Sequence, residues 1–96
     1  MLDNTVIVYM SDAPDTHHST GFEWPLVLVG NLKGKMTLGG QYLNFPGYGK
    51  AGHRTVGCLY NSFLRSVGTK QETFGRTDPD LDLLAMQSGP LTELMA

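Results

Sequence analysis

The sequence lacks the features that mark several large classes of protein. With one cysteine, Cys58, it has no partner for an internal disulfide. Its longest apolar runs, Val6 to Met10 and Leu26 to Val29, are far shorter than the ~20 residues of a membrane-spanning helix, so no membrane span is expected. Its 7 Lys and Arg residues are scattered and the formal net charge is -2, which argues against a basic face that binds nucleic acid.

The composition is typical of one small folded domain. The chain has 96 residues, of which 41% are hydrophobic and 17% are charged, and these values fit neither wholesale disorder nor a coiled coil. Its 12 glycines are too many for a helical bundle. A chain of this length also leaves little room for a complete enzyme.

Two apolar segments predict β-strands. Thr5 to Met10 and Pro25 to Gly30 are rich in β-branched and aliphatic residues and show no polar alternation. Such runs are typical of strands that are buried on both faces of a parallel or mixed sheet. We therefore expect an α/β fold with these two segments as its core strands.

Residues 31–52 form a glycine-rich, irregular stretch. The adjacent Gly39 and Gly40 permit the positive φ angles of a tight turn, so a loose hairpin is expected around them. The rest of the stretch predicts a long surface loop. In a small domain such a loop is usually functional or disordered.

The clearest helix lies between Thr55 and Gly68. Apolar residues recur there at the spacing of one helix face: Val56, Leu59, Tyr60, Phe63, Leu64 and Val67. Thr55 suits the N-cap, and Gly68 suits the left-handed position that ends a helix. Two further stretches, residues 80–86 and 91–95, each predict a turn or two of helix.

The segment after the first strand carries the residues best suited to chemistry. Asp12, His17 and His18 lie there, and open α/β sheets bind ligands at the carboxyl ends of their strands. Carboxylates and neutral imidazoles are usual metal ligands, so one hypothesis is a metal site. The alternative is a solvated turn, because adjacent histidines in an extended segment point in opposite directions. His53, just before the helix, is by itself typical of a surface residue or cap.

Two other residues are interpreted as structural. Cys58 is a small helix residue rather than a nucleophile, because no histidine faces it within a helical turn. Trp24 is expected to pack over the edge of the core. Stacking of Trp24 on a ligand is the alternative.

Several motifs, taken in order along nearly the whole chain, resemble a known family. They are the strand with its Ser-Asp ending at residues 2–12, His17-His18-Ser19, Glu23 to Gly30, Gly39 to Leu43, His53 to Val56 with Leu59-Tyr60, Val67-Gly68 and Phe74-Gly75. In these motifs the chain resembles the C-terminal part of a family of uncharacterised exported proteins abundant in planctomycetes. That family looks related to the alkaline phosphatase and sulfatase superfamily.

The resemblance implies that residues 1–96 are one partial domain, the C-terminal portion of an alkaline phosphatase-like three-layer α/β domain. It implies a divalent metal, zinc, calcium or manganese, with Asp12 and one of His17, His18 or His53 as ligands. Many members of the superfamily have His or Asn and then Gly after this aspartate, whereas an Ala-Pro pair follows it here. The nucleophile would lie upstream of this chain, so no catalytic residue is assigned.

Two functions are considered. The first is the C-terminal part of an exported, metal-dependent hydrolase of phosphate or sulfate esters on a small molecule or glycan, inactive without the rest of its domain. The alternative is a non-catalytic exported protein that keeps the scaffold and binds a partner or glycan through the glycine-rich loop and Trp24. In both cases the apolar strands would lack neighbours, so the isolated chain is expected to be marginally stable or prone to aggregate.

Overall fold

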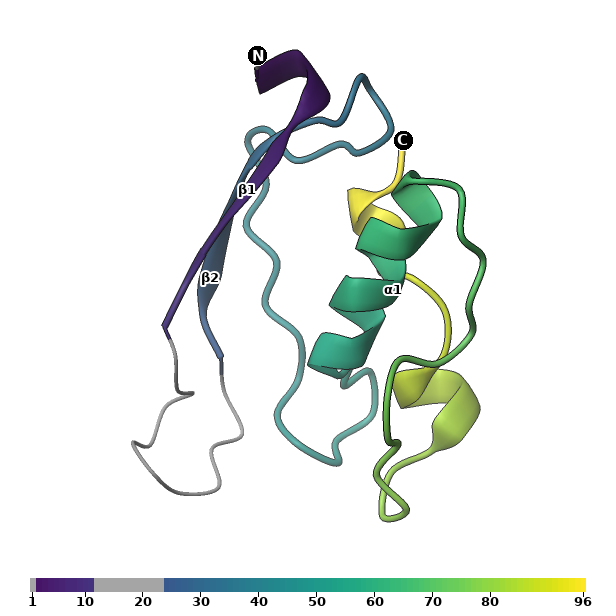
Figure 1. Cartoon of the computed structure of the whole chain (residues 1–96). Coiled ribbons are helices and arrows are strands. Elements are labelled where there is room, and N and C mark those ends of the chain that lie inside the picture. The colour runs from purple at the N-terminus through teal and green to yellow at the C-terminus, as the bar shows by residue number, and fades with distance from the viewer. Residues whose placement is uncertain (1, 12–23) are drawn as a thin grey trace.

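A computed structural model describes residues 2–11 and 24–96. In chain order it contains the 3-10 helix η1 (Leu2–Asn4), the strands β1 (Val6–Met10) and β2 (Leu26–Gly30), the helix α1 (Val56–Ser66), the π-helical turn η2 (Leu83–Gln87) and the 3-10 helix η3 (Thr92–Leu94). The strands lie on one side of α1, and the green segment that follows α1 runs back along the opposite side (Figure 1).

The two strands pair as an antiparallel sheet, with Val8 opposite Leu28. One face packs on the core through side chains such as Leu26 and Leu28. The other, which we call the outer face, carries four exposed apolar side chains: Ile7 (48%), Tyr9 (76%), Val27 (56%) and Val29 (46%). The expectation of a parallel or mixed sheet with both faces buried is therefore wrong for the described residues, because each strand has one neighbour and one covered face. The described elements do form a mixed α/β fold.

Gly30 allows the end of β2 to lie against the start of β1. Its φ is +113°, a conformation that residues with a side chain rarely adopt. A Cβ atom at this position would lie 2.0 Å from the carbonyl oxygen of Thr5. Only glycine fits there, and its pairing with Val6 sets the register of the sheet.

The predicted helix is confirmed as α1. Gly68 has a φ of +94°, and its N–H donates to the Arg65 carbonyl at 3.1 Å. The N–H of Thr69 donates to the Leu64 carbonyl at 2.9 Å, which completes a Schellman motif at the end of the helix. Thr55 is the N-cap residue, although its side chain makes no capping hydrogen bond. No helix within residues 2–11 and 24–96 is long and apolar enough to cross a membrane.

The predicted apolar stripe accounts for only part of the buried surface of α1. Val67, at its end, is 67% exposed. Most of the buried helix residues are small or polar: Cys58, Leu59, Asn61, Ser62 and Ser66. Cys58 and Ser62, for example, bind the backbone of the C-terminal segment: the Ser62 hydroxyl accepts from the N–H of Leu91 at 2.8 Å, and Sγ of Cys58 lies 3.4 Å from the Met86 carbonyl oxygen.

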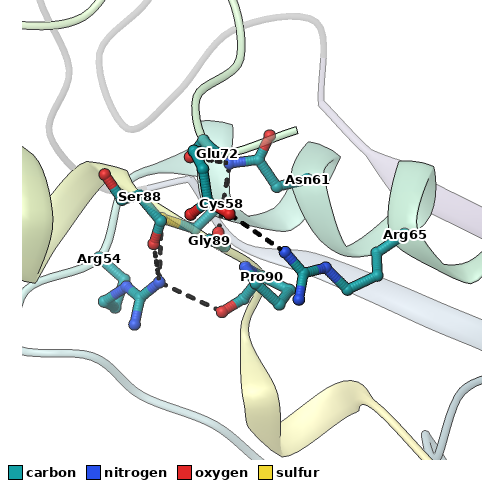
Figure 2. Close-up of polar contacts among 8 residues, drawn as sticks. All are labelled: Arg54, Cys58, Asn61, Arg65, Glu72, Ser88, Gly89 and Pro90. Atoms are coloured by element: carbon teal, nitrogen blue, oxygen red, sulfur yellow. Dashed lines mark hydrogen bonds and ion pairs between the residues drawn. The ribbon is translucent and has the colours of Figure 1, made fainter. Parts of the chain in front are cut away.

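Polar side chains on and next to α1 bind the backbone of the chain that follows the helix (Figure 2). We call this pair of side chains, Arg54 and Asn61, the polar seam. The Nη2 atom of Arg54 donates to the Ser88 carbonyl at 2.8 Å. The Nδ2 atom of Asn61 donates to the carbonyls of Glu72 and Gly89, at 3.1 and 3.2 Å. The C-terminal segment is thus attached to α1 through hydrogen bonds to its backbone as well as through apolar packing.

The core is small and lies between the sheet, α1 and the C-terminus. Its buried members come from three separate parts of the chain: Met36, Cys58, Leu59, Leu91 and Leu94. Met36 also pairs with Met95 in an isolated β-bridge. The two stretches predicted to form short helical turns supply η2 and η3, which confirms that prediction.

The hairpin expected around Gly39 and Gly40 is not formed. The chain turns there, and Gly40 has a φ of +73°, but no strand pairing flanks the turn within the described residues. Apolar side chains on either side, Leu38 and Phe45, pack singly against the core instead. Residues 31–52 are accordingly a long loop, most of whose residues are exposed.

Candidate functional site

Of the candidate residues, His53 lies in the described part of the chain, in the loop that precedes α1. The last residue of β1 and the first residue of α1 lie on the same side of the molecule (Figure 1). Asp12 follows β1 by two residues in the sequence, and His53 lies in the loop that leads into α1. Asp12, His17 and His18 fall outside the described residues, so His53 is the predicted ligand whose surroundings can be described.

Trp24 closes the described end of the strand pair. Its indole Nε1 donates to the carbonyl oxygen of Ser11 at 3.1 Å. The residue is partly buried, but it is not one of the described side chains that pack against the core, so its predicted packing over the core edge stays a prediction. This hydrogen bond links Ser11 to Trp24, the described residues on either side of residues 12–23.

His53 is held in a compact loop, residues 46–53. Its Nδ1 atom lies 2.9 Å from the carbonyl oxygen of Pro46, and the residue is only 9% exposed, so it is not the surface residue that its isolated position suggested. The N–H of Lys50 donates to Gly47, and the N–H of His53 donates to Lys50, both at 3.0 Å. Gly52 adopts a φ of +86°, which brings the chain back across Pro46.

Tyr48 connects this loop to a distant segment. The ring centroids of Tyr48 and His53 are 5.8 Å apart in a T-shaped arrangement. The Tyr48 hydroxyl donates to Oδ2 of Asp78 at 2.5 Å. This hydrogen bond raises the pKa of Tyr48 above its ordinary value and lowers the pKa of Asp78 below its own. The pair is therefore a neutral phenol bound to an ionised carboxylate at neutral pH.

Asp78 is itself fixed by Gln87, which is 5% exposed. The N–H of Asp78 donates to Oε1 of Gln87 at 2.6 Å, and Nε2 of Gln87 donates back to the Asp78 carbonyl at 2.8 Å. The second carboxylate oxygen of Asp78 accepts from the N–H of Asp80 at 2.8 Å. A buried side chain thus anchors the residue that holds Tyr48.

A cavity of about 190 Å³ lies between the amino end of α1 and the segment that contains Asp78. Residues 55–57, Tyr60, Phe74 and Arg76 contribute to its lining, and the two aromatic rings are 4.9 Å apart. Its volume is smaller than the roughly 300–1,000 Å³ of usual ligand pockets. The cavity adjoins the loop site but does not by itself define a binding site.

His53 fits a divalent metal as one ligand. Its Nδ1 atom lies within hydrogen-bonding distance of a backbone carbonyl, a contact that metal-binding histidines commonly make. Among residues 2–11 and 24–96, no three His, Cys, Asp or Glu side chains come together closely enough to hold a metal ion. Further ligands from this chain would therefore be Asp12, His17 or His18.

Cys58 does not belong to this site. The side chain is fully buried, and its Sγ lies 3.4 Å from the carbonyl oxygen of Met86. The environment is a packed helix face, in agreement with its interpretation as a small structural residue.

Sequence reasoning missed Tyr48 and Asp78. They are 30 residues apart, so no local spacing relates them. The one signal in the sequence was the glycine-rich stretch 31–52, whose length suggested a functional loop.

Comparison with known proteins does not assign the chain to a family. No family model, no curated protein and no solved structure matches it. The arguments for function therefore come from the geometry of the site and from the resemblance of the motifs.

Proposed function

We propose that this chain is the C-terminal portion of an exported protein of the alkaline phosphatase and sulfatase type, and that it contributes metal ligands to the hydrolysis of phosphate or sulfate esters. The observation that carries the proposal is the arrangement of two segments at one end of the molecule: the strand that leads to Asp12, and the loop that holds His53 in front of α1 (Figure 1). In open α/β domains, ligands bind beyond the carboxyl ends of the strands.

A divalent ion at this position would polarise the ester oxygen and lower the pKa of a bound water or hydroxyl. From this chain, Asp12 would supply a carboxylate oxygen, and His53 with His17 or His18 would supply imidazole nitrogens. Of zinc, calcium and manganese, an imidazole donor favours zinc over calcium, since calcium takes oxygen ligands. The nucleophile would come from another part of the larger protein, so the chain alone would be inactive.

The two strands support the idea of a larger sheet. Neither β1 nor β2 contains a charged residue or a proline, the devices that usually keep exposed edge strands from associating. The outer face is entirely apolar, and its four side chains remain exposed to solvent among the described residues. Neighbouring strands and a covering layer, as in a three-layer α/β domain, would bury both the edges and this face.

The alternative function is a non-catalytic exported protein that binds a glycan or a partner. The observation that favours it is Tyr42, which lies in the glycine-rich loop and is 89% exposed. An exposed aromatic ring suits stacking on a sugar or on an apolar partner surface. Trp24 contributes less to such a surface, because its indole nitrogen is engaged with Ser11.

Metal content of the full-length gene product tests the proposal. By inductively coupled plasma mass spectrometry, we expect bound metal in the wild type and its loss in His53→Ala and in His17→Ala or His18→Ala. Lys50→Ala, an exposed change in the same loop, is the matched control and should keep the metal. A wild-type protein that carries no metal and cleaves neither p-nitrophenyl phosphate nor p-nitrophenyl sulfate would favour the non-catalytic alternative.

The gene itself gives a second test. We expect the reading frame to continue upstream of the Met1 codon and to encode further strands with an acidic metal motif and a hydroxyl or thiol nucleophile. An in-frame stop codon directly upstream would refute the partial domain.

A further inference from the structure

We propose that a second copy of this chain docks in the groove between the sheet and α1, and that it does so through the two exposed leucines of η2, Leu83 and Leu84. The contact joins unlike surfaces, because the groove of one copy takes the leucines of the other. The inference goes beyond the proposed function and does not depend on it, since neither surface contains a predicted metal ligand.

The first surface is an apolar groove of about 290 Å³ between the inner face of the sheet and α1. Six apolar residues line it: Val6, Val8, Leu32, Phe63, Leu64 and Val67. The last three belong to the apolar stripe of the helix, so the stripe and the sheet face each other here without closing on one another. This opening accounts for Val67, which is 67% exposed. Apolar side chains of a partner would remove the groove from water, which is favourable.

The second surface is formed by Leu83 and Leu84, and we call these two side chains the leucine knob. Leu84 is 82% exposed and Leu83 is 48% exposed. Two hydrogen bonds fix the turn that carries them. The Asp82 carboxylate accepts from the N–H of Ala85 at 2.7 Å, and the Ser88 hydroxyl donates to the Leu83 carbonyl at 2.8 Å. The leucine knob is therefore ordered before a partner binds, which lowers the entropic cost of docking.

The groove and the leucine knob lie at opposite ends of α1 (Figure 1). The groove includes Leu64 and Val67 at the end of the helix, whereas η2 lies beside its start, where the Met86 carbonyl accepts from the N–H of Thr55 at 3.1 Å. The leucine knob therefore cannot fill the groove of its own copy. Contact between the two surfaces requires two copies, joined head to tail.

The segment that carries the leucine knob is acidic. Residues 77–96 contain four acidic residues, Asp78, Asp80, Asp82 and Glu93, and no lysine or arginine. Asp80 and Asp82 directly precede the leucine knob and are exposed. Because like charges repel, this arrangement disfavours contact between two knobs.

The border of the groove is basic. Three exposed lysines stand next to lining residues in the sequence: Lys33, Lys35 and Lys70. Asp3, whose carbonyl oxygen accepts from the N–H of Lys33, adds one acidic residue on the same side, and the balance stays positive. Opposite charges thus favour the approach of the acidic knob of a second copy and determine which surfaces meet.

The experiment mixes two complementary variants of the 96-residue chain. Leu84→Asp disables the leucine knob and keeps the groove, whereas Val67→Asp blocks the groove and keeps the leucine knob; both positions are exposed. Every protein, including the parent, carries Ile7→Lys so that the outer face does not contribute. By sedimentation velocity at high micromolar concentration, which suits a contact of this small size, we expect the parent to self-associate and each variant alone to be monomeric. An equimolar mixture of the two variants should form a complex of one copy of each.

Several outcomes overturn the inference. A parent that stays monomeric does so, as does a mixture in which the two variants sediment as they do alone. Association that persists in both separate variants would mean that the copies meet elsewhere. Tyr42→Asp places the same charge on another exposed residue and is the matched control for Leu84→Asp. It should associate like the parent, and its failure to do so would count against the leucine knob.

NMR locates the contact. When 15N-labelled Leu84→Asp is mixed with unlabelled Val67→Asp, the amide shifts should change at the residues that line the groove, and changes confined to other residues overturn the inference. Added salt should weaken the complex, because it screens the opposite charges; a complex that salt strengthens overturns the charge pairing. Circular dichroism shows whether each variant keeps its fold. If Val67→Asp does not, Val67→Ala takes its place and should associate more weakly than the parent.

Discussion

Asn61 of the polar seam offers a test of how the described part of this chain is held together. The side chain is 1% exposed, and its Nδ2 atom donates to the carbonyls of Glu72 and Gly89. In Asn61→Ala both hydrogen bonds are lost. The Glu72 carbonyl still accepts from the N–H of Gly89 at 2.8 Å, whereas the Gly89 carbonyl loses the one side-chain donor that binds it among the described residues.

The magnitude follows from these contacts. Each lost hydrogen bond costs about 1 kcal/mol, and the part-buried Gly89 carbonyl left without this donor adds up to about 1 kcal/mol. The Oδ1 atom of Asn61 is buried without a partner among the described residues, and its removal offsets part of this loss. We expect Asn61→Ala to reduce the free energy of unfolding by about 2–3 kcal/mol, or to lower Tm by roughly 10–20 °C in a domain of this size.

The assay is urea denaturation followed by circular dichroism and Trp24 fluorescence, with Asn44→Ala as the control. Asn44 is exposed, so its substitution should change stability by less than about 0.5 kcal/mol. Asn61→Asp should cost more than Asn61→Ala at neutral pH, because a carboxylate would face two carbonyl oxygens. It should recover part of the loss as the pH falls, since the neutral acid can donate again. If Asn61→Ala unfolds at the same urea concentration as the wild type, the polar seam does not stabilise the fold.

Three further predictions concern other parts of the molecule. The hydrogen bond between Tyr48 and Asp78 should fail at both extremes of pH: the lowered pKa of Asp78 makes its contribution disappear as pH falls through the acidic range, and the raised pKa of Tyr48 makes it disappear as pH rises through the alkaline range. Absorbance of tyrosinate at 295 nm should show one tyrosine titrating late, and Tyr48→Phe should abolish that late step. Gly30→Ala should destabilise the sheet by about 2 kcal/mol or more, because of its positive φ and the backbone that the new Cβ would strike; unchanged thermal unfolding would contradict the observed pairing. Ile7→Lys on the outer face should reduce self-association in sedimentation velocity without unfolding the chain, whereas Leu28→Lys on the inner face should unfold it. Equal effects of the two lysines would refute the assignment of the faces.

The helix was the most predictable element of the fold. Its apolar spacing and the glycine at its end are local properties, and α1 with its Schellman motif follows from them. The two strands were predictable as segments, but their pairing was not. An apolar run without alternation indicates a strand buried on both faces, whereas the number and direction of neighbouring strands depend on the rest of the sheet. The sequence could therefore not show that the apolar outer face would be exposed among the described residues.

The candidate site was predictable only in part. By itself His53 was interpreted as a surface residue or cap, and only the resemblance implied that it is a metal ligand with Asp12, His17 or His18. The contacts of His53 with Pro46 and Tyr48, and of Tyr48 with Asp78, could not be anticipated from the sequence. These contacts depend on where residues 46–53 and the segment after α1 come to lie.

The sequence by itself determined the glycine-rich loop, the main helix with its ends, and the lack of a long apolar run or of a second cysteine among these 96 residues. Each of these depends on composition or on spacings of a few residues. Only the tertiary structure decided that the strands pair antiparallel with one face open, that the polar side of α1 binds the returning chain, and that Asp78 reaches Tyr48. Contacts between residues 30 positions apart arise when the whole chain folds back on itself, and no local pattern specifies them.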